Sequence, residues 1–505
     1  MLKKITAILI TAAIFAALAP QSIANANASD ARPATESTPI PSQTIQQSSI
    51  VDPTGQETLS PVLVAQSAIL MERSTGKIVY DKDADERIYP ASMTKILTAL
   101  TALDYLKPDE ILVVGDEMHQ APSGSSIAYL REGEAVSVEN LMRALLIASG
   151  NEAACTIALN AAKRARNAQN MAYDEAEQVF SQLMNNMARK LGAYNTHFTN
   201  PHGFHDDDHY STAKDIALLS SKLMDNELLS KIVAEQTYKG QSVDMATPPD
   251  GSSLEYHEWN SHNEIIKQGE YYYPYATGIK TGFTSQAGNC LASSANKNGL
   301  EFISVVCFSP EPNHWLDTIA LFDYGFNNYA FRQLNLTGVV ERAAVDNPRL
   351  GMEQTIEIYA EAKESFFMST VEFESISQII TYFPEFVVEP GEGDPADSLV
   401  VKGPFAKNAR LGAIKYTLGD KTLLEAPLLA SAEVLPRTVQ TDMDYYWQQI
   451  SNTLFTEELT PLWIGGAALL CALLIFIIIV KIKNARRNRH KDSLTFSRGG
   501  RYSSW

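Results

Sequence analysis

Two apolar runs of unequal length limit which parts of this chain can fold in water. The run from Leu462 to Val480 is long enough to cross a bilayer as a single helix. A dense group of basic residues follows it at once: Lys481, Lys483, Arg486, Arg487, Arg489 and Lys491. The positive-inside rule then predicts a transmembrane helix at 461–480 and a basic cytoplasmic tail at 481–505.

The other run, Ile5 to Leu18, lies at the N-terminus and is shorter than a bilayer requires. Lys3 and Lys4 precede it, and small residues ending at Ala28 follow it. This layout predicts a secretory signal peptide at 1–28 rather than a second membrane span. We therefore expect a single-pass membrane protein whose main body is exported and whose C-terminus stays in the cytoplasm.

The net charge of −18 is unevenly distributed between the compartments. Removing the +7 of the tail and the +2 of the leader from −18 leaves −27 on the exported part. So acidic a body does not bind nucleic acid through bulk charge, and we expect no nucleic-acid partner. An anionic substrate would have to be met by a few local cations.

Four cysteines are too few for a fold built on disulfides. Cys471 lies in the apolar run, which leaves three in the exported part. A hairpin turning at Asn298-Gly299 would place Cys290 opposite Cys307. The two could form a cross-strand disulfide or remain small apolar residues on buried strands, and the second alternative is favoured.

The pattern along the chain predicts two exported domains. A Pro-, Ser- and Thr-rich flexible linker is expected at 29–58. Residues 59–333 begin with a hairpin around Ser74-Thr75-Gly76, continue through a block of helices and end in strands, which predicts an α/β fold with one sheet and helical layers. Short β-rich segments predict a small β domain at 334–435, and 436–460 connect it to the membrane.

Within the expected helix Ser92–Leu106, a serine stands one turn before a lysine. Ser92 and Lys95 occupy positions i and i+3, so they share one face of the helix. A serine hydroxyl is a weak nucleophile that needs a base beside it, and a lysine can be that base only when its pKa is depressed by burial or by a second cation. Alone, this spacing is more often produced by chance.

Two further motifs follow in the chain: Ser149 and Asn151 within "IASGNEAA", and Lys280, Thr281 and Gly282 within "GIKTGFT". In this order, the three motifs resemble those of the penicillin-recognising serine peptidases and β-lactamases. The segments "GSSIAYLREGE" and "NTHFTNPHGFHDDDHYSTAKDIA" resemble the low-molecular-mass penicillin-binding proteins, which are D-alanyl-D-alanine carboxypeptidases. The resemblance covers roughly residues 60–330 and extends to an accessory β domain.

The resemblance implies a role for each motif residue. Ser92 attacks the carbonyl between two D-alanines of a peptidoglycan stem peptide, Lys95 accepts its proton, and Ser149 relays a proton to the leaving amine. Asn151 binds a substrate carbonyl, and Lys280 and Thr281 meet the terminal carboxylate. Gly282 lets the peptide lie along the strand, and the Phe283 N–H completes an oxyanion hole with that of Ser92. No cofactor or metal is implied, and β-lactams are the expected acylating inhibitors.

Some relatives carry an arginine near the carboxylate, whereas this chain has His262 and His314 in the corresponding regions. One hypothesis is that a protonated histidine assists carboxylate binding at acidic pH. The alternative is that both are histidines without a role.

A cluster of histidines and aspartates offers a competing interpretation, because it could be drawn as a metal site. It comprises His202, His205, Asp206, Asp208 and His209. Neighbours in a turn seldom converge on one ion, so a structural loop is favoured.

Two other functions remain open at this stage. A β-lactamase would use the same serine, although the exported β domain and the membrane tether suit a polymeric substrate. A wall-binding protein with an inactive catalytic domain would not need the intact Ser92 and Lys95.

Overall fold

The computed structural model describes residues 47–51, 57–243, 252–388, 399–454, 456 and 460–495. The expected signal peptide at 1–28 lies outside the described residues, as does the end of the basic tail. Part of the expected linker is strand, since β1 (Gln47–Val51) pairs with β2 (Glu57–Pro61).

A five-stranded antiparallel sheet lies at the centre of the part of the chain before the second, β-rich part. Its strands run in the order β4 (Ile78–Lys82), β3 (Ser67–Glu72), β11 (Leu300–Ser309), β10 (Gly288–Lys297) and β9 (Ala276–Thr284). The hairpins expected at Ser74–Gly76 and Asn298-Gly299 are confirmed by the β3–β4 and β10–β11 pairings. Asn298 and Gly299 both have positive φ, as a two-residue hairpin turn requires.

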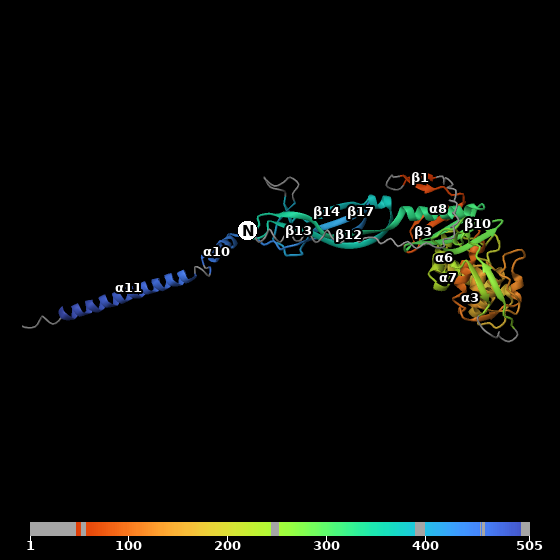
Figure 1. Cartoon of the computed structure of the whole chain (residues 1–505), viewed down its shortest axis with the longest axis horizontal. Coiled ribbons are helices and arrows are strands. Elements are labelled where there is room, and N and C mark those ends of the chain that lie inside the picture. The colour runs from red at the N-terminus through yellow and green to blue at the C-terminus, as the bar shows by residue number, and fades with distance from the viewer. Residues whose placement is uncertain are drawn as a thin grey trace, which may run out of the picture. The chain divides into compact units, whose positions relative to one another are not determined.

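Helices cover both faces of this sheet (Figure 1). Alternate residues of β3 point to opposite sides: Leu70 packs with α8 (Asn313–Asn328), whereas Ile69 packs with the helical block. The helical block consists of α2 (Lys95–Ala102), α3 (Val138–Leu146), α4 (Asn151–Arg166), α5 (Tyr173–Lys190), α6 (Ala213–Met224) and α7 (Glu227–Ala234). The catalytic motifs therefore lie between an edge strand, β9, and this block.

Short elements join these layers. They are the 3₁₀ turns η1 (Ala91–Thr94), η2 (Asp116–Gln120) and η3 (Glu264–Ile266), and the two-stranded ribbons β5 (Ile111–Val113) with β6 (Ala135–Ser137) and β7 (Thr237–Gln241) with β8 (Tyr256–Asn260).

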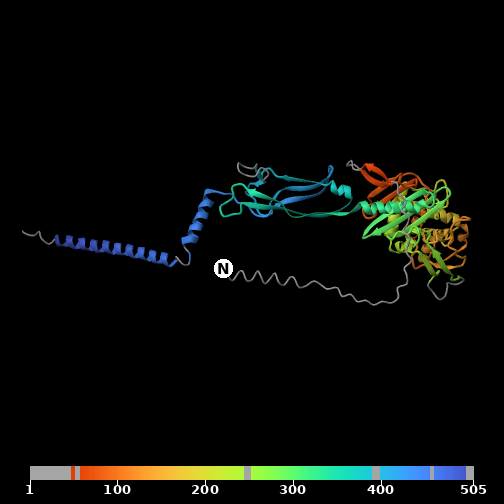
Figure 2. The same cartoon turned by 45° about the horizontal axis from the view of Figure 1, so that its top comes forward.

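A seven-stranded sheet follows, in the order β14 (Ser377–Tyr382), β17 (Arg410–Leu418), β18 (Lys421–Ala430), β13 (Thr355–Ser369), β12 (Tyr329–Val345), β16 (Val400–Val401) and β15 (Val387–Val388). The long pair β12–β13 is the teal ribbon pair in Figure 2. A short helix, α9 (Thr370–Glu374), follows β13. This second sheet has an apolar core of its own. The fold class inferred from the sequence, an α/β fold followed by a small β domain, is confirmed.

Two helices end the described chain: α10 (Val439–Leu454) and α11 (Thr460–Thr495). The span Pro461–Arg487 of α11 is long and apolar enough to cross a membrane, and none of it is buried against protein. α10 stands where only a connecting segment was expected. Its exposed apolar side chains recur at helical spacing, which explains the difference: Val439, Met443, Tyr446, Trp447, Ile450 and Leu454.

Candidate active site

Ser92 lies in a tight turn rather than in an α-helix. The expected helix Ser92–Leu106 is wrong at both ends, because η1 carries Ser92 and α2 begins only at Lys95 and stops at Ala102. Ala91, the residue before Ser92, has a left-handed φ of 46°. The turn keeps the i and i+3 residues close, so the relation between Ser92 and Lys95 survives the change of helix type.

Strand β9 approaches this turn at a glycine. A Cβ atom on Gly282 would lie 2.9 Å from the Pro90 carbonyl oxygen and 3.2 Å from the Ser92 nitrogen. Only a residue without a side chain allows such a close approach of two backbones. The glycine expected to leave room for substrate thus also brings the strand edge against the Ser92 turn.

Lys95 is fully buried, and its amine contacts three oxygens. Nζ lies 2.9 Å from Ser92 Oγ, 2.6 Å from Asn151 Oδ1 and 2.8 Å from the His202 carbonyl oxygen. The last two oxygens can only accept hydrogen bonds. A neutral amine has two N–H bonds and one lone pair, so satisfying both acceptors directs the lone pair at the one neighbour with a proton to donate, the Ser92 hydroxyl.

The surroundings of Lys95 favour this neutral amine. Burial lowers its pKa well below the usual range, and the positive charge of Lys280 lowers it further. Glu152 opposes the shift through its charge, but its own pKa is raised by burial. In the part of the chain that the structure describes, Lys95 makes no ion pair with a carboxylate.

Lys280 is the second buried lysine of the site, in the interior of β9. Only 2 % of its surface is exposed, and burial lowers its pKa to about 7. Its ammonium donates to the carbonyl oxygen of Thr281 at 3.0 Å. Near neutral pH, Lys280 is therefore divided between a cation and a neutral amine.

Ser149 and Asn151 stand at the start of α4, where the chain breaks between two helices. Ser149 has a left-handed φ of 59°, and Asn151 opens the helix and reaches Lys95 with its side-chain oxygen. The Asn151 N–H donates to the Ser126 carbonyl oxygen at 2.9 Å. Both residues are buried, and the break that was expected from sequence brings Asn151 against Lys95 and Ser149 into the wall of the same groove as Ser92.

Sequence reasoning did not identify Glu152, the next residue of α4. Its Oε1 accepts hydrogen bonds from the backbone N–H groups of Ala128 at 2.5 Å and Leu130 at 3.3 Å. The carboxylate therefore ties the segment before the second motif to the helix that carries Asn151. An acidic residue in the first turn of an apolar helix was the available signal, but such residues also occur there for the helix dipole alone.

The third acceptor of Lys95, the His202 carbonyl, was also missed. It belongs to a loop that packs directly on the Ser92 turn, because a Cβ on Gly203 would collide with the backbone of Ala91. Asn200 closes the loop: its Oδ1 accepts from the Gly203 N–H at 2.8 Å and its Nδ2 donates to the Phe204 carbonyl at 3.0 Å. The backbone carbonyl has no signature in a sequence.

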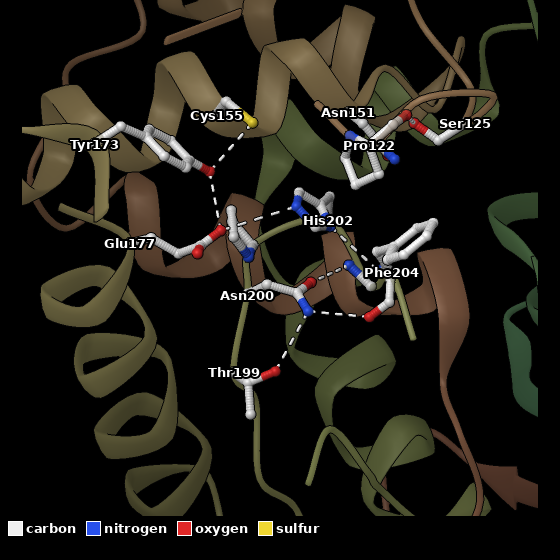
Figure 3. A network of polar contacts seen from close by, with 12 residues as sticks. Pro122, Ser125, Asn151, Cys155, Tyr173, Glu177, Thr199, Asn200, His202 and Phe204 are labelled. Carbon is white, nitrogen blue, oxygen red and sulfur yellow. Dashed lines mark hydrogen bonds and ion pairs between the residues drawn. The ribbon is translucent and has the colours of Figure 1, made fainter. Parts of the chain in front are cut away.

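Behind this loop lies a buried polar network, shown in Figure 3. The His202 ring accepts from the Phe204 N–H through Nδ1 at 3.1 Å, and its Nε2 faces Glu177 at 3.9 Å. The Tyr173 hydroxyl lies 3.1 Å from both Glu177 Oε1 and Cys155 Sγ. The network fixes the His202 ring and with it the carbonyl that accepts from Lys95.

His209, one of the residues that could be drawn as a metal site, has other contacts on both ring nitrogens. The ring of His209 meets Thr94 Oγ1 through Nε2 at 2.8 Å and accepts the Thr199 N–H through Nδ1 at 3.1 Å. Within the described residues, no group of three or more His, Cys, Asp or Glu side chains is arranged to hold a metal ion. The segment serves as the loop that supports Lys95.

His262 and His314 both line the groove above Ser92. Burial lowers the pKa of each to about 4, and for His262 the charge of Lys280 adds to the effect. A histidine with this pKa is neutral from pH 5 upward. These lowered pKa values oppose the hypothesis that one of them is a protonated carboxylate partner, which stays a prediction to be tested.

Cys290 and Cys307 are free, buried thiols. The strands shift register between Asn289 and Leu291, but the two thiols remain in contact, and a hydrogen bond from Cys307 lowers the pKa of the Cys290 thiol. Cys290 lies under the groove wall, where its thiol donates to the Ala287 carbonyl at 3.4 Å. The alternative of small apolar residues on buried strands agrees with this arrangement.

A groove of about 560 Å³ opens over Ser92. Its walls include residues of all three sequence motifs and the residue after the third: Ser92, Ser149, Asn151, Thr281, Gly282 and Phe283. Lys95 and Lys280 lie beneath it, fully enclosed. Two exposed aromatic residues, Phe204 and Phe283, flank the opening. All eight site residues named from the sequence therefore converge on one place.

The site residues named from the sequence all lie in the part of the chain that one family model matches. The family model described as D-alanyl-D-alanine carboxypeptidase (Peptidase_S11) matches residues 54–310, half of the chain. The chain belongs to the D-alanyl-D-alanine carboxypeptidase family.

Among curated relatives of this family, the D-alanyl-D-alanine carboxypeptidase DacF of Bacillus subtilis is 32 % identical over 281 residues, covering 54 % of this chain and 65 % of the relative. The D-alanyl-D-alanine carboxypeptidase DacC of Escherichia coli is 32 % identical over 256 residues, covering 49 % and 57 %. The matched part thus spans less than two thirds of the length of either relative.

The crystal structure of penicillin binding protein 5 from Haemophilus influenzae has a TM-score of 0.50 and 23 % sequence identity to this chain. It covers 75 % of this chain and 100 % of its own. At this identity the likeness shows the fold, and its coverage extends beyond the 54–310 match.

Proposed function

We propose that this protein is a serine D-alanyl-D-alanine carboxypeptidase that removes the terminal D-alanine from peptidoglycan stem peptides. The observation that supports it most strongly is the setting of Lys95. Its Nζ lies 2.9 Å from Ser92 Oγ and within hydrogen-bond distance of the oxygens of Asn151 and His202, so a neutral amine that donates to these two oxygens turns its lone pair to the Ser92 hydroxyl. This is the arrangement a lysine needs to act as a general base.

Acylation begins when the Ser92 oxygen attacks the carbonyl carbon between the two D-alanines and its proton passes to Lys95 Nζ. The oxygen of that carbonyl becomes negative and is stabilised by the backbone N–H groups of Ser92 and Phe283. The proton then reaches the leaving amine through the Ser149 hydroxyl, and the C–N bond breaks. Free D-alanine departs, and Ser92 holds an ester.

Substrate binding uses the edge of β9. Thr281 lines the groove and offers a hydroxyl to the terminal carboxylate, while Lys280 lies below and supplies positive potential. Asn151 accepts from Lys95 through Oδ1, which leaves its side-chain N–H groups for a substrate carbonyl. Gly282 keeps the strand close to the Ser92 turn, so a peptide paired with this strand lies across the nucleophile.

Deacylation uses water. Lys95, neutral again after the proton has left with D-alanine, takes a proton from a water molecule that attacks the ester carbonyl. The bond from that carbon to Ser92 Oγ then breaks, and Lys95 returns the proton to Ser92 Oγ. A β-lactam ring presents a strained amide to the same serine and forms the same ester. Because its leaving group stays attached, water attack is hindered, and we expect β-lactams to inhibit by persistent acylation.

We propose that the chain is divided as the sequence predicts, with a catalytic domain at 59–333 and a β domain at 334–435. The strand β12 begins at Tyr329, directly after α8, which supports a boundary near this point. The core of the second sheet lies wholly on one side of this point, while the core around α8 lies on the other side except for Phe367 of β13, and this division supports the boundary too.

Membrane attachment through α11 is proposed, with the catalytic domain outside and the basic tail in the cytoplasm. The apolar span Pro461–Arg487 supports an anchor, and the cluster of basic residues after Val480 supports the orientation. The apolar stripe of α10, which includes Tyr446 and Trp447, suits the water–lipid interface just before the span.

The deciding experiment incubates the purified full-length protein with a pentapeptide ending in D-Ala-D-Ala and measures released D-alanine. We expect steady release, lost by at least about 10³-fold in Ser92→Ala and in Lys95→Ala. Intact protein mass after exposure to a penicillin should show one adduct in the wild type and none in Ser92→Ala. Rapid turnover of a chromogenic cephalosporin without D-alanine release would instead identify a β-lactamase.

A further inference from the structure

A second groove continues from the catalytic one on the side of the segment Ser125–Leu130. The two grooves share Ser125, Ser126 and His262 in their walls. The second groove measures about 630 Å³ and reaches from Tyr129 across β8 to Lys267. It contains none of the residues assigned to acyl transfer, so the proposed chemistry does not require it.

Tyr129, at the rim of this groove, is held in an unusual position. Its φ is 61°, in the left-handed region that a bulky residue rarely adopts, and 75 % of its surface is exposed. An exposed side chain gains nothing from packing that would offset such a backbone. Strained positions of this kind persist where the surroundings impose them, and they cluster at binding sites.

Buried groups on both sides of Tyr129 impose this backbone. The Glu152 carboxylate accepts from the N–H groups of Ala128 and Leu130, the two neighbours of Tyr129. The Trp259 indole N–H donates to the Ala128 carbonyl at 2.8 Å. The aromatic ring is thus presented outward from a rigid base, and Glu152 connects that base to the helix that carries Asn151.

The groove is electrically neutral. Glu258 is paired with Lys239 at 2.7 Å, and Glu264 is paired with Lys267 at 2.6 Å. The remaining polar wall consists of hydroxyl and amide groups, from Ser125, Ser126, Asn260 and Ser261. Because its charges are already neutralised within the protein, the groove does not select a carboxylate or an ammonium. It suits an uncharged ligand that has both hydrogen-bonding groups and an apolar face.

We propose that this second groove binds a saccharide ring of the wall polymer, with the ring stacked on Tyr129 and its hydroxyl or acetamido groups on the serine and asparagine side chains. A sugar ring is the uncharged part of peptidoglycan, and its C–H face matches an aromatic surface. The inference rests on the proposed function for the identity of the polymer. The groove would then select stem peptides that are attached to glycan over free peptides.

Binding can be measured without catalysis, using the full-length Ser92→Ala protein and the tetramer of N-acetylglucosamine as probe. We expect saturable binding by calorimetry, weakened about tenfold in Tyr129→Gly and retained in Tyr129→Phe. Glycine adopts a φ of 61° freely, so this variant keeps the loop. Tyr194→Gly is the matched control, because Tyr194 is also 75 % exposed but lines neither groove, and it should bind as the parent does.

A kinetic comparison separates this inference from the proposed function. The ratio of kcat/KM for a disaccharide pentapeptide to that for the free pentapeptide should fall about tenfold in Tyr129→Gly and stay at the wild-type value in Tyr129→Phe. Absence of D-alanine release from both substrates in the wild type would overturn the carboxypeptidase and leave the binding measurement to judge the groove. No tetramer binding, together with an unchanged ratio, would overturn the saccharide site.

Discussion

The catalytic region and the C-terminal β domain treat buried polar groups in opposite ways. The first encloses two lysines, several carboxylates, and several histidines and hydroxyls, including Lys95, Lys280 and Glu152. In the described part of 334–435, the buried polar residues are only Ser369 and Thr417. Burying an amine without a carboxylate partner is costly. The catalytic region bears that cost where it lowers the pKa of a base, whereas the β domain has no such site.

The cations of the β domain illustrate the difference. Lys415 meets Glu425 at 3.2 Å and Arg342 meets Glu357 at 2.8 Å, all with substantial exposure. Surface pairs of this kind contribute little to stability and change little when removed. The comparison therefore predicts that a lysine removed from the catalytic sheet will alter function and stability in opposite directions, and that one removed from the β sheet will alter neither.

The largest effect is expected for Lys280→Met. Loss of its positive potential should lower kcat/KM by about 10²–10³-fold. The folded pKa of about 7 lies below the unfolded value, so the unfolded chain holds more protons from pH 7 to about 10. Wild-type stability should thus fall as the pH falls through this window, and methionine, which carries no charge, should raise stability at pH 7 by roughly 1–4 kcal/mol.

The measurement is thermal unfolding of full-length protein between pH 7 and 10, with D-alanine release in parallel. The gain in Tm for Lys280→Met should shrink as the pH approaches 10. Lys415→Met is the control from the β domain and should leave both quantities unchanged within about 0.5 kcal/mol. A Lys280→Met protein less stable than the wild type at pH 7 would contradict the assigned cost of burial.

Two strand glycines provide a second contrast. A Cβ on Gly282 would press on the Ser92 turn, and a Cβ on Gly412 would press on Tyr382 Cα at 2.9 Å in the neighbouring strand β14. Gly282→Ala should lower kcat/KM about 10²-fold, because small shifts of a nucleophile are costly. Gly412→Ala should destabilise the protein by about 1–3 kcal/mol through overpacking.

These two variants are compared by steady-state kinetics at 25 °C and by chemical denaturation. If Gly412→Ala keeps wild-type kcat/KM despite its lower stability, the contrast between the two regions is supported. If Gly412→Ala loses activity as strongly as Gly282→Ala, the contrast is wrong, since the β domain would then be part of the catalytic machinery.

The smallest effect concerns the two groove histidines. Their pKa values near 4 leave them neutral between pH 5 and 8, so neither contributes a charge to carboxylate binding there. We expect KM for the pentapeptide to follow the same pH course, within about twofold, in the wild type and in His262→Asn and His314→Asn. If KM falls as the pH is lowered in the wild type but not in one of the variants, the histidine replaced in that variant is a cationic partner of the carboxylate.

The amino-acid sequence was sufficient to single out the proposed nucleophile, its proposed base and the strand beside them. Ser92, Lys95, Ser149, Asn151 and Lys280 stand in three short motifs, and the resemblance of these motifs to those of a known family, rather than their spacing alone, identified them. The hairpins at Gly76 and Asn298-Gly299 were predictable because Gly and Asn are the residues that tight turns prefer. The apolar run at 462–480 is likewise a property of composition.

Tertiary structure decided what surrounds the base. The His202 carbonyl, the clamp from Glu152 to the backbone around Tyr129 and the neutrality of His262 and His314 all arise between segments far apart in the chain. Burial and charge at a point depend on every element packed around it, and a backbone carbonyl is the same in every residue. The sequence therefore identifies the side chains proposed to react. The packing of β9 and of the loop that contains His202 on the Ser92 turn determines whether the Lys95 amine is protonated.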